Sequence, residues 1–227
     1  MTTVLFWDID GTLLTTGRAG MIAWDQAVHE VTGRAFDLKT AIRTSGFTDY
    51  QIAVKTLEVL GLSADPEVVE GLVRRYEELL PAALPKREGR VLDNVREILE
   101  HLGQTRPDVR SLLLTGNTRG GARAKLTYYG LWDFFPDGAF SQDTGARAGI
   151  ATRALQLARA SGAAADAAVY VIGDTPHDIE CAKAIDAKTV AVATGGYTLA
   201  ELLPLQPWYA CETLPPPAAF EELIDRR

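Results

Sequence analysis

Short apolar runs alternate with helical segments along most of this 227-residue chain, and that alternation restricts the folds open to it. Runs rich in valine, leucine, isoleucine and alanine predict strands at 4–7, 109–114, 168–172 and 189–193, with shorter ones at 138–141 and 208–211. Strands that are apolar throughout and are joined through helices form parallel sheets with both faces covered. The sequence therefore predicts a doubly wound α/β domain.

One long segment, 16–88, departs from this alternation, because it is expected to be helical throughout. A glycine-containing stretch opens it, and Pro81 and Pro85 break the chain at its end. The spacing of its apolar residues predicts helices at about 21–31, 51–60 and 66–80. We therefore expect an α/β catalytic core formed by 1–15 and 89–227, with 16–88 inserted as an all-helical cap. The alternative is that these helices belong to the main body of the fold.

The first strand ends in two carboxylates, Asp8 and Asp10. A buried unpaired carboxylate costs several kcal/mol, so this pair requires a cation or a reaction, unless it is simply an acidic turn. Polar residues follow two later strands in the same way: Thr115, Asn117, Asp174 and Asp178. Because ligands bind beyond the carboxyl ends of parallel strands, we expect these side chains to meet at one edge of the sheet.

Four carboxylates gathered at that edge would repel one another unless a divalent cation lay among them. Carboxylate and carbonyl oxygens suit Mg2+, which is held by few carboxylates together with waters and phosphate oxygens. We therefore predict a metal site formed by Asp8, Asp10, Asp174 and Asp178. The i, i+4 spacing of the last two would place both on one face of a helical turn. Asp178 could instead simply cap the helix that it begins.

The remaining residues of this edge suit a phosphoryl group. Thr115 offers a hydroxyl, and the helix that follows offers free N–H groups and the positive end of its dipole. Gly11 lets the backbone turn sharply beside a ligand, and Thr12 adds a hydroxyl and a backbone N–H. A cation must balance the phosphate charge. Arg147, just before a helix, is the first candidate, and Lys125, expected to be solvated in mid-helix, is the second.

Together these groups suggest phosphoryl transfer. A carboxylate attacks phosphorus, Mg2+ neutralises charge, and a second acid protonates the leaving oxygen. The same acid, then acting as a base, activates the water that hydrolyses the aspartyl-phosphate.

Three motifs carry a resemblance to a known family. Asp8–Leu13 resembles the first motif of the haloacid dehalogenase-like (HAD) hydrolase superfamily, Leu114–Asn117 the second and Gly173–Asp178 the fourth. The resemblance covers nearly the whole chain, and the insertion, with its turn Gly46–Asp49, is similar to the cap of phosphoglycolate phosphatase-like members. It implies a Rossmann-like core with a helical cap, and a Mg2+-dependent phosphatase that hydrolyses a small phosphorylated metabolite.

The resemblance also implies roles for individual residues. Asp8 would be the nucleophile and a metal ligand. Asp10 would be the general acid/base, with its backbone carbonyl on the metal, and Thr115 would hold the transferring phosphoryl group. Asp174 would bind Mg2+, and Asp178 would support it directly or through water.

The third motif departs from the family pattern. Many relatives carry a lysine followed by proline there, whereas this chain has Gly145–Gly149, so Arg147 would grip the phosphate oxygens. The other predicted phosphate and substrate contacts are Gly11, Thr12, Gly116, Asn117 and Arg43. Arg43 is favoured among three insertion residues near the expected hinges and turns, the others being Arg18 and Thr44. The alternative for each of the three is a solvated surface residue.

Composition argues against several classes of protein. A net charge of −7 disfavours broad binding to nucleic acid or anionic membranes. The cysteines Cys181 and Cys211 form neither a disulfide framework nor the spacing of a zinc site. No run approaches the ~20 apolar residues of a membrane span, and no basic segment followed by a long apolar run opens the sequence. We expect a cytoplasmic enzyme, monomeric or homodimeric, whose partner is a small phosphorylated metabolite.

Other functions on the same scaffold stay open. A phosphomutase would need a cap that holds a sugar bisphosphate, and the sequence shows no clear signature of one. Dehalogenase and phosphonatase chemistry need no acid/base at Asp10 and are less favoured. A non-catalytic binding module is disfavoured because every motif but the third is intact. The substrate is not predicted, since the insertion residues that face the pocket cannot be identified from the sequence.

Overall fold

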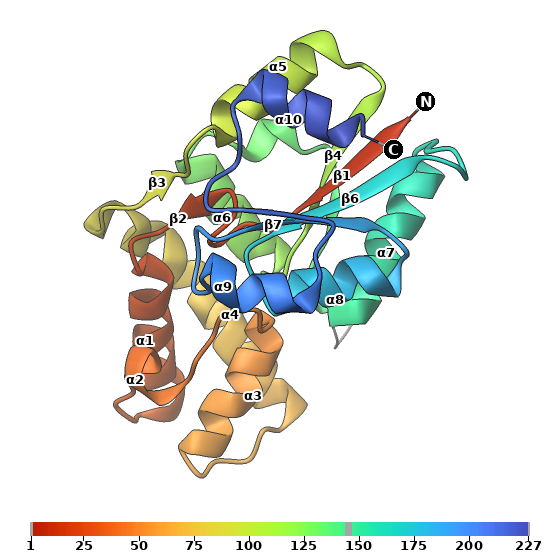
Figure 1. The fold of residues 1–227 in the computed structure, drawn as a ribbon. Helices are drawn as coiled ribbons and strands as arrows, with labels where there is room; N and C mark the ends of the chain where they lie inside the picture. Colours follow the sequence, from red (N-terminus) through yellow and green to blue (C-terminus); the bar gives the residue numbers. More distant parts are fainter. Residues whose placement is uncertain (1, 144–146, 227) are drawn as a thin grey trace.

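A six-stranded sheet forms the centre of the molecule (Figure 1). The computed structural model describes residues 2–143 and 147–226. The strand order is β5-β4-β1-β6-β7-β8, and every neighbouring pair is parallel. The strands are β1 (Thr3–Trp7), β4 (Val109–Leu114), β5 (Gly138–Ala139), β6 (Ala168–Gly173), β7 (Lys188–Val192) and β8 (Tyr209–Cys211).

Strand β1 occupies the middle of this sheet. Its residue Trp7 lies in register with Leu113 of β4 and Ile172 of β6. The segments that follow these three strands therefore leave the sheet at the same edge. This register is what brings the polar residues after each strand towards one another.

Helices cover both faces of the sheet. Because successive side chains of a strand point to opposite faces, Leu5 and Trp7 pack against α5, α6 and α10, while Val4 and Phe6 pack against α7 and α8. The bounds of these helices are α5 (Val95–Thr105), α6 (Arg119–Tyr128), α7 (Arg147–Ala160), α8 (Pro176–Ala184) and α10 (Pro217–Ile224). The doubly wound α/β fold is thus confirmed.

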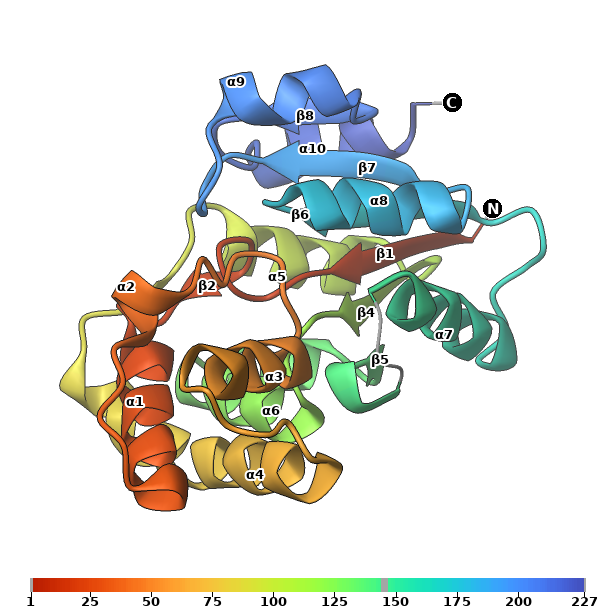
Figure 2. The same ribbon diagram turned by 90° about the horizontal axis from the view of Figure 1, so that it is seen from below.

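The helical insertion is also present. Four helices, α1 (Ala19–Thr32), α2 (Leu38–Ala41), α3 (Asp49–Val59) and α4 (Pro66–Ala83), surround a hydrophobic cluster of their own. Both views place them together at the end of the sheet towards which β1 runs (Figure 1, Figure 2). Strands β2 (Leu14–Thr15) and β3 (Arg90–Val91) pair antiparallel where the chain enters and leaves this part. The exact division into 1–15, 16–88 and 89–227 stays a prediction.

The last helix of the insertion ends later than predicted. Pro81 lies inside α4, which continues to Ala83, instead of breaking the chain. A proline in the last turn forfeits one backbone hydrogen bond, and Leu80 and Ala83 on either side of it are buried and hold the turn in place. The strand predicted at 138–141 is also shorter, because Ser141 begins a 3-10 turn.

Short elements escaped the sequence analysis because they contain too few residues for a periodic pattern. They are β2, β3, α2, α9 (Leu199–Leu202) and the 3-10 turns Leu84–Lys86, Trp132–Phe134, Ser141–Asp143 and Leu203–Leu205. Among the described residues, no helix combines the length and apolar character that crossing a bilayer requires.

Candidate active site

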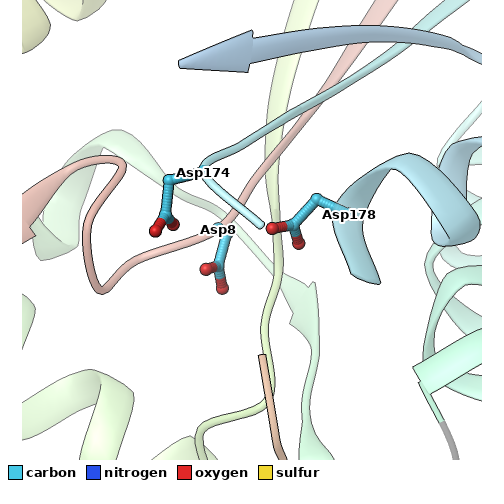
Figure 3. Close-up of side chains that lie close together, drawn as sticks. All are labelled: Asp8, Asp174 and Asp178. Carbon is cyan, nitrogen blue, oxygen red and sulfur yellow. The ribbon is translucent and has the colours of Figure 1, made fainter. Parts of the chain in front are cut away.

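Three of the predicted acids meet at the carboxyl edge of the sheet (Figure 3). Asp8 follows β1, Asp174 follows β6, and Asp178 lies in the first turn of α8. One carboxylate oxygen of each lies within 4.8 Å of the others, and all three residues are buried. Asp178 also accepts hydrogen bonds from the backbone N–H and the hydroxyl of Thr175, at 3.1 and 2.6 Å. It therefore caps its helix and also belongs to the acidic cluster, and its role as a metal ligand stays a prediction.

The electrostatics of this cluster favour a bound cation. Burial, followed by repulsion from Asp178, raises the pKa of Asp8 to about 7, although Arg147 opposes the rise. Burial and repulsion from Asp8 raise the pKa of Asp174 well above its ordinary range. Three buried carboxylates offer only oxygen ligands, which are the donors that a hard divalent cation prefers. The cluster consequently fits a divalent metal ion.

Arg147 lies beside the cluster, at the first position of α7. Its Nη1 is 3.1 Å from Asp178 Oδ1 and 4.0 Å from Asp8 Oδ1. Its Nε donates to the backbone carbonyl of Gly46 in the insertion at 2.9 Å. The guanidinium thus reaches both the nucleophile candidate and the insertion. The preceding residues of the third motif, Gly145 and Ala146, lie outside the described residues.

The side chain of Asp10 is held by a separate group of residues. Its Oδ2 accepts hydrogen bonds from Lys125 Nζ at 2.6 Å and from Asn117 Nδ2 at 2.9 Å. The prediction that Lys125 is solvated is wrong, because the residue is only 5% exposed. It lies on the same face of α6 as the buried Ala122 and Leu126. The i, i+3, i+4 spacing of these residues in the sequence could have indicated that Lys125 is buried.

Lys125 stays charged in this environment. Burial lowers its pKa, but the Asp10 carboxylate, the Tyr76 hydroxyl and Asp49 more than offset burial and raise the pKa above its ordinary value. Tyr76 and Asp49 belong to the insertion, on α4 and α3. The charge of a core lysine is therefore stabilised in part by the insertion.

Some of the predicted phosphate-binding residues line the cavity, and others are buried next to it. Gly11, Gly116 and Asn117 line the cavity, together with Asp8, Asp10, Asp174, Arg147 and Lys125. Thr12 and Thr115 are buried and do not line the cavity. Thr12 donates to Asp174 Oδ1 at 3.1 Å, and Thr115 Oγ1 accepts from Asn117 Nδ2 at 2.8 Å. These two threonines position the residues that line the cavity.

Two glycines at this edge of the sheet allow neighbouring groups to lie close to the backbone. Gly11 has φ +86°, and a Cβ there would lie 2.5 Å from Asp174 Oδ2. At Gly116 a Cβ would lie 2.7 Å from the backbone oxygen of Phe47 in the insertion. A side chain at either position would displace an active-site carboxylate or the insertion itself.

The insertion covers part of the cavity, which has a volume of about 350 Å3. Its contribution is largely apolar and includes Met21, Trp24, Leu38, Ile52 and Tyr76. Arg18 and Thr44 also line the cavity. Arg43 does not line it, and its guanidinium lies 4.4 Å from the ring centre of Tyr197 instead. Arg43 lies in the loop after α2, and in this structure the loop does not bring it to the cavity as predicted.

A carboxylate of the insertion occupies the N-terminus of α6, where a phosphoryl oxygen was expected. Asp49 Oδ2 accepts from the Thr118 backbone N–H at 2.8 Å, and the Asp49 N–H donates to the Gly116 carbonyl at 2.9 Å. Burial raises the pKa of Asp49 to about 6. In the sequence Asp49 stands at the end of the turn Gly46–Asp49, and nothing in the local pattern indicated this contact with the core.

Comparison with known proteins identifies the family of this chain. The model of the haloacid dehalogenase-like hydrolase family matches residues 4–192. The chain belongs to the haloacid dehalogenase-like hydrolases. This membership confirms the resemblance drawn from the motifs, and the protein is accordingly an enzyme of this hydrolase family.

Individual relatives are similar over nearly their whole length. The protein named "Probable phosphatase IndB" of Dickeya dadantii is 27% identical over 217 residues, which cover 94% of this chain and 90% of that protein. A hydrolase from Pseudomonas syringae is 20% identical, with a TM-score of 0.73 and coverage of 99% and 98%. CbbY from Rhodobacter sphaeroides, solved with phosphate, is 15% identical, with a TM-score of 0.74 and coverage of 94% and 95%. The two structures establish similarity of fold.

Proposed function

We propose that this HAD-like hydrolase is a Mg2+-dependent phosphatase that hydrolyses a small phosphorylated metabolite through an aspartyl-phosphate on Asp8. One observation carries the proposal. A buried carboxylate within an acidic cluster that fits a metal ion and a second carboxylate two residues later share one cavity, and each has its own cation, Arg147 or Lys125. The name of the relative in Dickeya dadantii supports the same reaction class.

In the first step, an oxygen of Asp8 attacks the phosphorus atom and the bond to the leaving oxygen breaks. Asp10, in its protonated form, gives its proton to that oxygen, so the product leaves as an alcohol. In the second step, Asp10 takes a proton from water, and the resulting hydroxide oxygen attacks phosphorus. Asp8 is then regenerated and inorganic phosphate is released.

The residues around Asp8 hold the phosphoryl group in this proposal. Arg147 and the Gly116 backbone N–H face its oxygens, and Thr115 orders the loop behind them. Asp8, Asp174 and Asp178, with the backbone carbonyl of Asp10, would hold Mg2+. When bound, the ion neutralises negative charge on the phosphoryl oxygens and on the acidic cluster.

The insertion has a complementary role. Its helices cover part of the cavity, and in this proposal they close further over Asp8 and exclude bulk water during the first transfer, which limits access to small substrates. A freely diffusing phosphorylated metabolite in the cytoplasm suits this small cavity and the net charge of −7. Nucleic acid and membranes suit neither.

The test is hydrolysis of 4-nitrophenyl phosphate and of a panel of phosphorylated metabolites, including phosphoglycolate, sugar phosphates, nucleotides and pyrophosphate, with and without Mg2+. Asp8→Asn is expected to lower kcat by at least about 1000-fold. Asp166→Asn, in an exposed loop, is the matched control and is expected to keep full activity. Unchanged turnover in Asp8→Asn would refute the proposal. Isomerisation of a hexose phosphate without net phosphate release would favour a phosphomutase instead.

A further inference from the structure

The ammonium group of Lys125 donates to two acceptors of the core and also contacts the Tyr76 hydroxyl of the insertion. Its Nζ lies 2.6 Å from Asp10 Oδ2 and 2.6 Å from Asn117 Oδ1. Among the ion pairs of the described residues, none joins Lys125 to Asp8, Asp174 or Asp178. Arg147 is the cation of that acidic cluster. The two buried cations of the cavity therefore serve different carboxylates.

Lys125 and Asn117 together fix one oxygen of Asp10. Oδ2 accepts from both residues, and Asn117 is itself anchored to Thr115 Oγ1 at 2.8 Å. No hydrogen bond among the described residues engages the other oxygen, Oδ1, and the side chain of Asp10 is 44% exposed. An exposed aspartate without such anchors would rotate freely about χ1 and χ2. The anchors leave one oxygen of Asp10 fixed and the other available to the cavity.

The insertion completes this arrangement. Tyr76 of α4 and Asp49 of α3 lie next to Lys125. They exclude water from the ammonium group, and a charge-assisted hydrogen bond is stronger where water is excluded. The contact between Lys125 and Asp10 is therefore strongest with the insertion closed over the core.

We infer that Lys125 is a positioning residue for Asp10: it holds Oδ2 so that Oδ1 is presented to the leaving oxygen and then to water. It does not grip the transferring phosphoryl group. The inference rests on the phosphatase reaction proposed above, in which Asp10 transfers the proton. It assigns to Lys125 a function distinct from that of Arg147.

The two possible functions of Lys125 predict different dependence on the leaving group. The 4-nitrophenolate ion is a stable anion that departs without a proton, whereas an alkoxide must be protonated as it leaves. Loss of a residue that aligns Asp10 therefore slows the first step for an alkyl phosphate and spares it for an aryl phosphate. Loss of a residue that grips the phosphoryl group slows the first step for both.

The experiment compares kcat/KM of the Mg2+-loaded full-length enzyme for 4-nitrophenyl phosphate and for glycerol 1-phosphate. In Lys125→Met we expect a loss of about 100-fold with the alkyl ester and less than about 5-fold with the aryl ester. The aryl ester should also give a burst of one 4-nitrophenolate per site, because the second step still needs Asp10 to activate water. Lys125→Arg keeps a donor to Asp10 and should recover part of the alkyl activity.

Lys183→Met is the matched control, since Lys183 is an exposed lysine of α8 that donates to the Leu205 carbonyl. It should leave both kcat/KM values unchanged. Equal losses with the two esters in Lys125→Met, or no loss with either, would overturn the inference. If Lys125→Met does not fold, Lys125→Gln provides the same comparison. A wild-type enzyme that hydrolyses neither ester would instead refute the proposed function itself.

Discussion

The contact between Asp49 and the N-terminus of α6 makes a quantitative prediction about stability. Asp49 is buried, belongs to the insertion and accepts a hydrogen bond from the Thr118 N–H of the core. It is not part of the acidic cluster, so metal binding does not obscure its titration. Replacing it by asparagine keeps an oxygen for Thr118 and removes the charge.

The magnitude follows from the pKa of this carboxyl. Burial raises the pKa of Asp49 from its ordinary 3.8 to about 6, against the opposing effects of Lys125 and Thr118. The folded state therefore binds more protons than the unfolded state between these values, and the free energy of unfolding falls as pH rises through this interval. A pKa difference of roughly two units between the folded and unfolded states corresponds to about 3 kcal/mol in the free energy of unfolding. That loss begins near pH 4 and is complete above pH 7.

The assay is urea unfolding of wild type and Asp49→Asn at intervals from pH 4 to pH 7.5, with EDTA present throughout. The difference between the two proteins cancels the titration of the other carboxyls. We expect the stability of the variant relative to wild type to increase by about 3 kcal/mol over this range. Asp166→Asn is the control, and its difference from wild type should not change with pH.

A difference between Asp49→Asn and wild type that stays constant with pH would refute this reasoning, because it would mean that the folded state does not penalise the charge. If Asp49→Asn became less stable relative to wild type as pH rises, the sign of the expected effect would be reversed. It would mean that Lys125 and Thr118 outweigh the cost of burial.

Two further predictions concern the acidic cluster. Adding Mg2+ to EDTA-treated protein at pH 8 should raise the melting temperature, because the cation relieves repulsion among three buried carboxylates, and Asp174→Asn should lose most of that increase. Gly11→Ala should lower the free energy of unfolding by at least about 1–2 kcal/mol in urea titrations, because its φ of +86° disfavours a side chain and a Cβ would meet Asp174. Gly103→Ala, in open space on α5, is the control, and an equal loss there would contradict the argument.

Much of the fold was predictable because the strands are short and apolar and the helices have clear apolar spacing. Strand β4 was predicted with its observed limits, Val109–Leu114, and β1, β6 and β7 to within a residue or so. Their buried faces are continuous, and that continuity is visible in the sequence. The β2–β3 pair was not predicted, because strands of two residues are too short to show an alternation of apolar and polar residues.

The convergence of Asp8 and Asp174 was predictable for a similar reason. The parallel sheet brings the ends of neighbouring strands to one edge, so knowing which residue follows each strand is enough to place them. Lys125, Asp49 and Arg43 depend on something else. Their surroundings come from how the insertion packs against α6 and where its turns point, and neither follows from local spacing.

The central place of β1 also determines when the active site can form during synthesis of the chain. β1 is made first, but its neighbours β4 and β6 end at Leu114 and Gly173, far later in the sequence. The helices α1–α4, which share their own hydrophobic cluster, are complete well before either neighbour has been synthesised. Contacts between distant segments form only after the loop-closure entropy has been overcome. A ribosome-bound chain that stops before β6 therefore contains Asp8 and a complete helical insertion, but neither Asp174 nor Asp178.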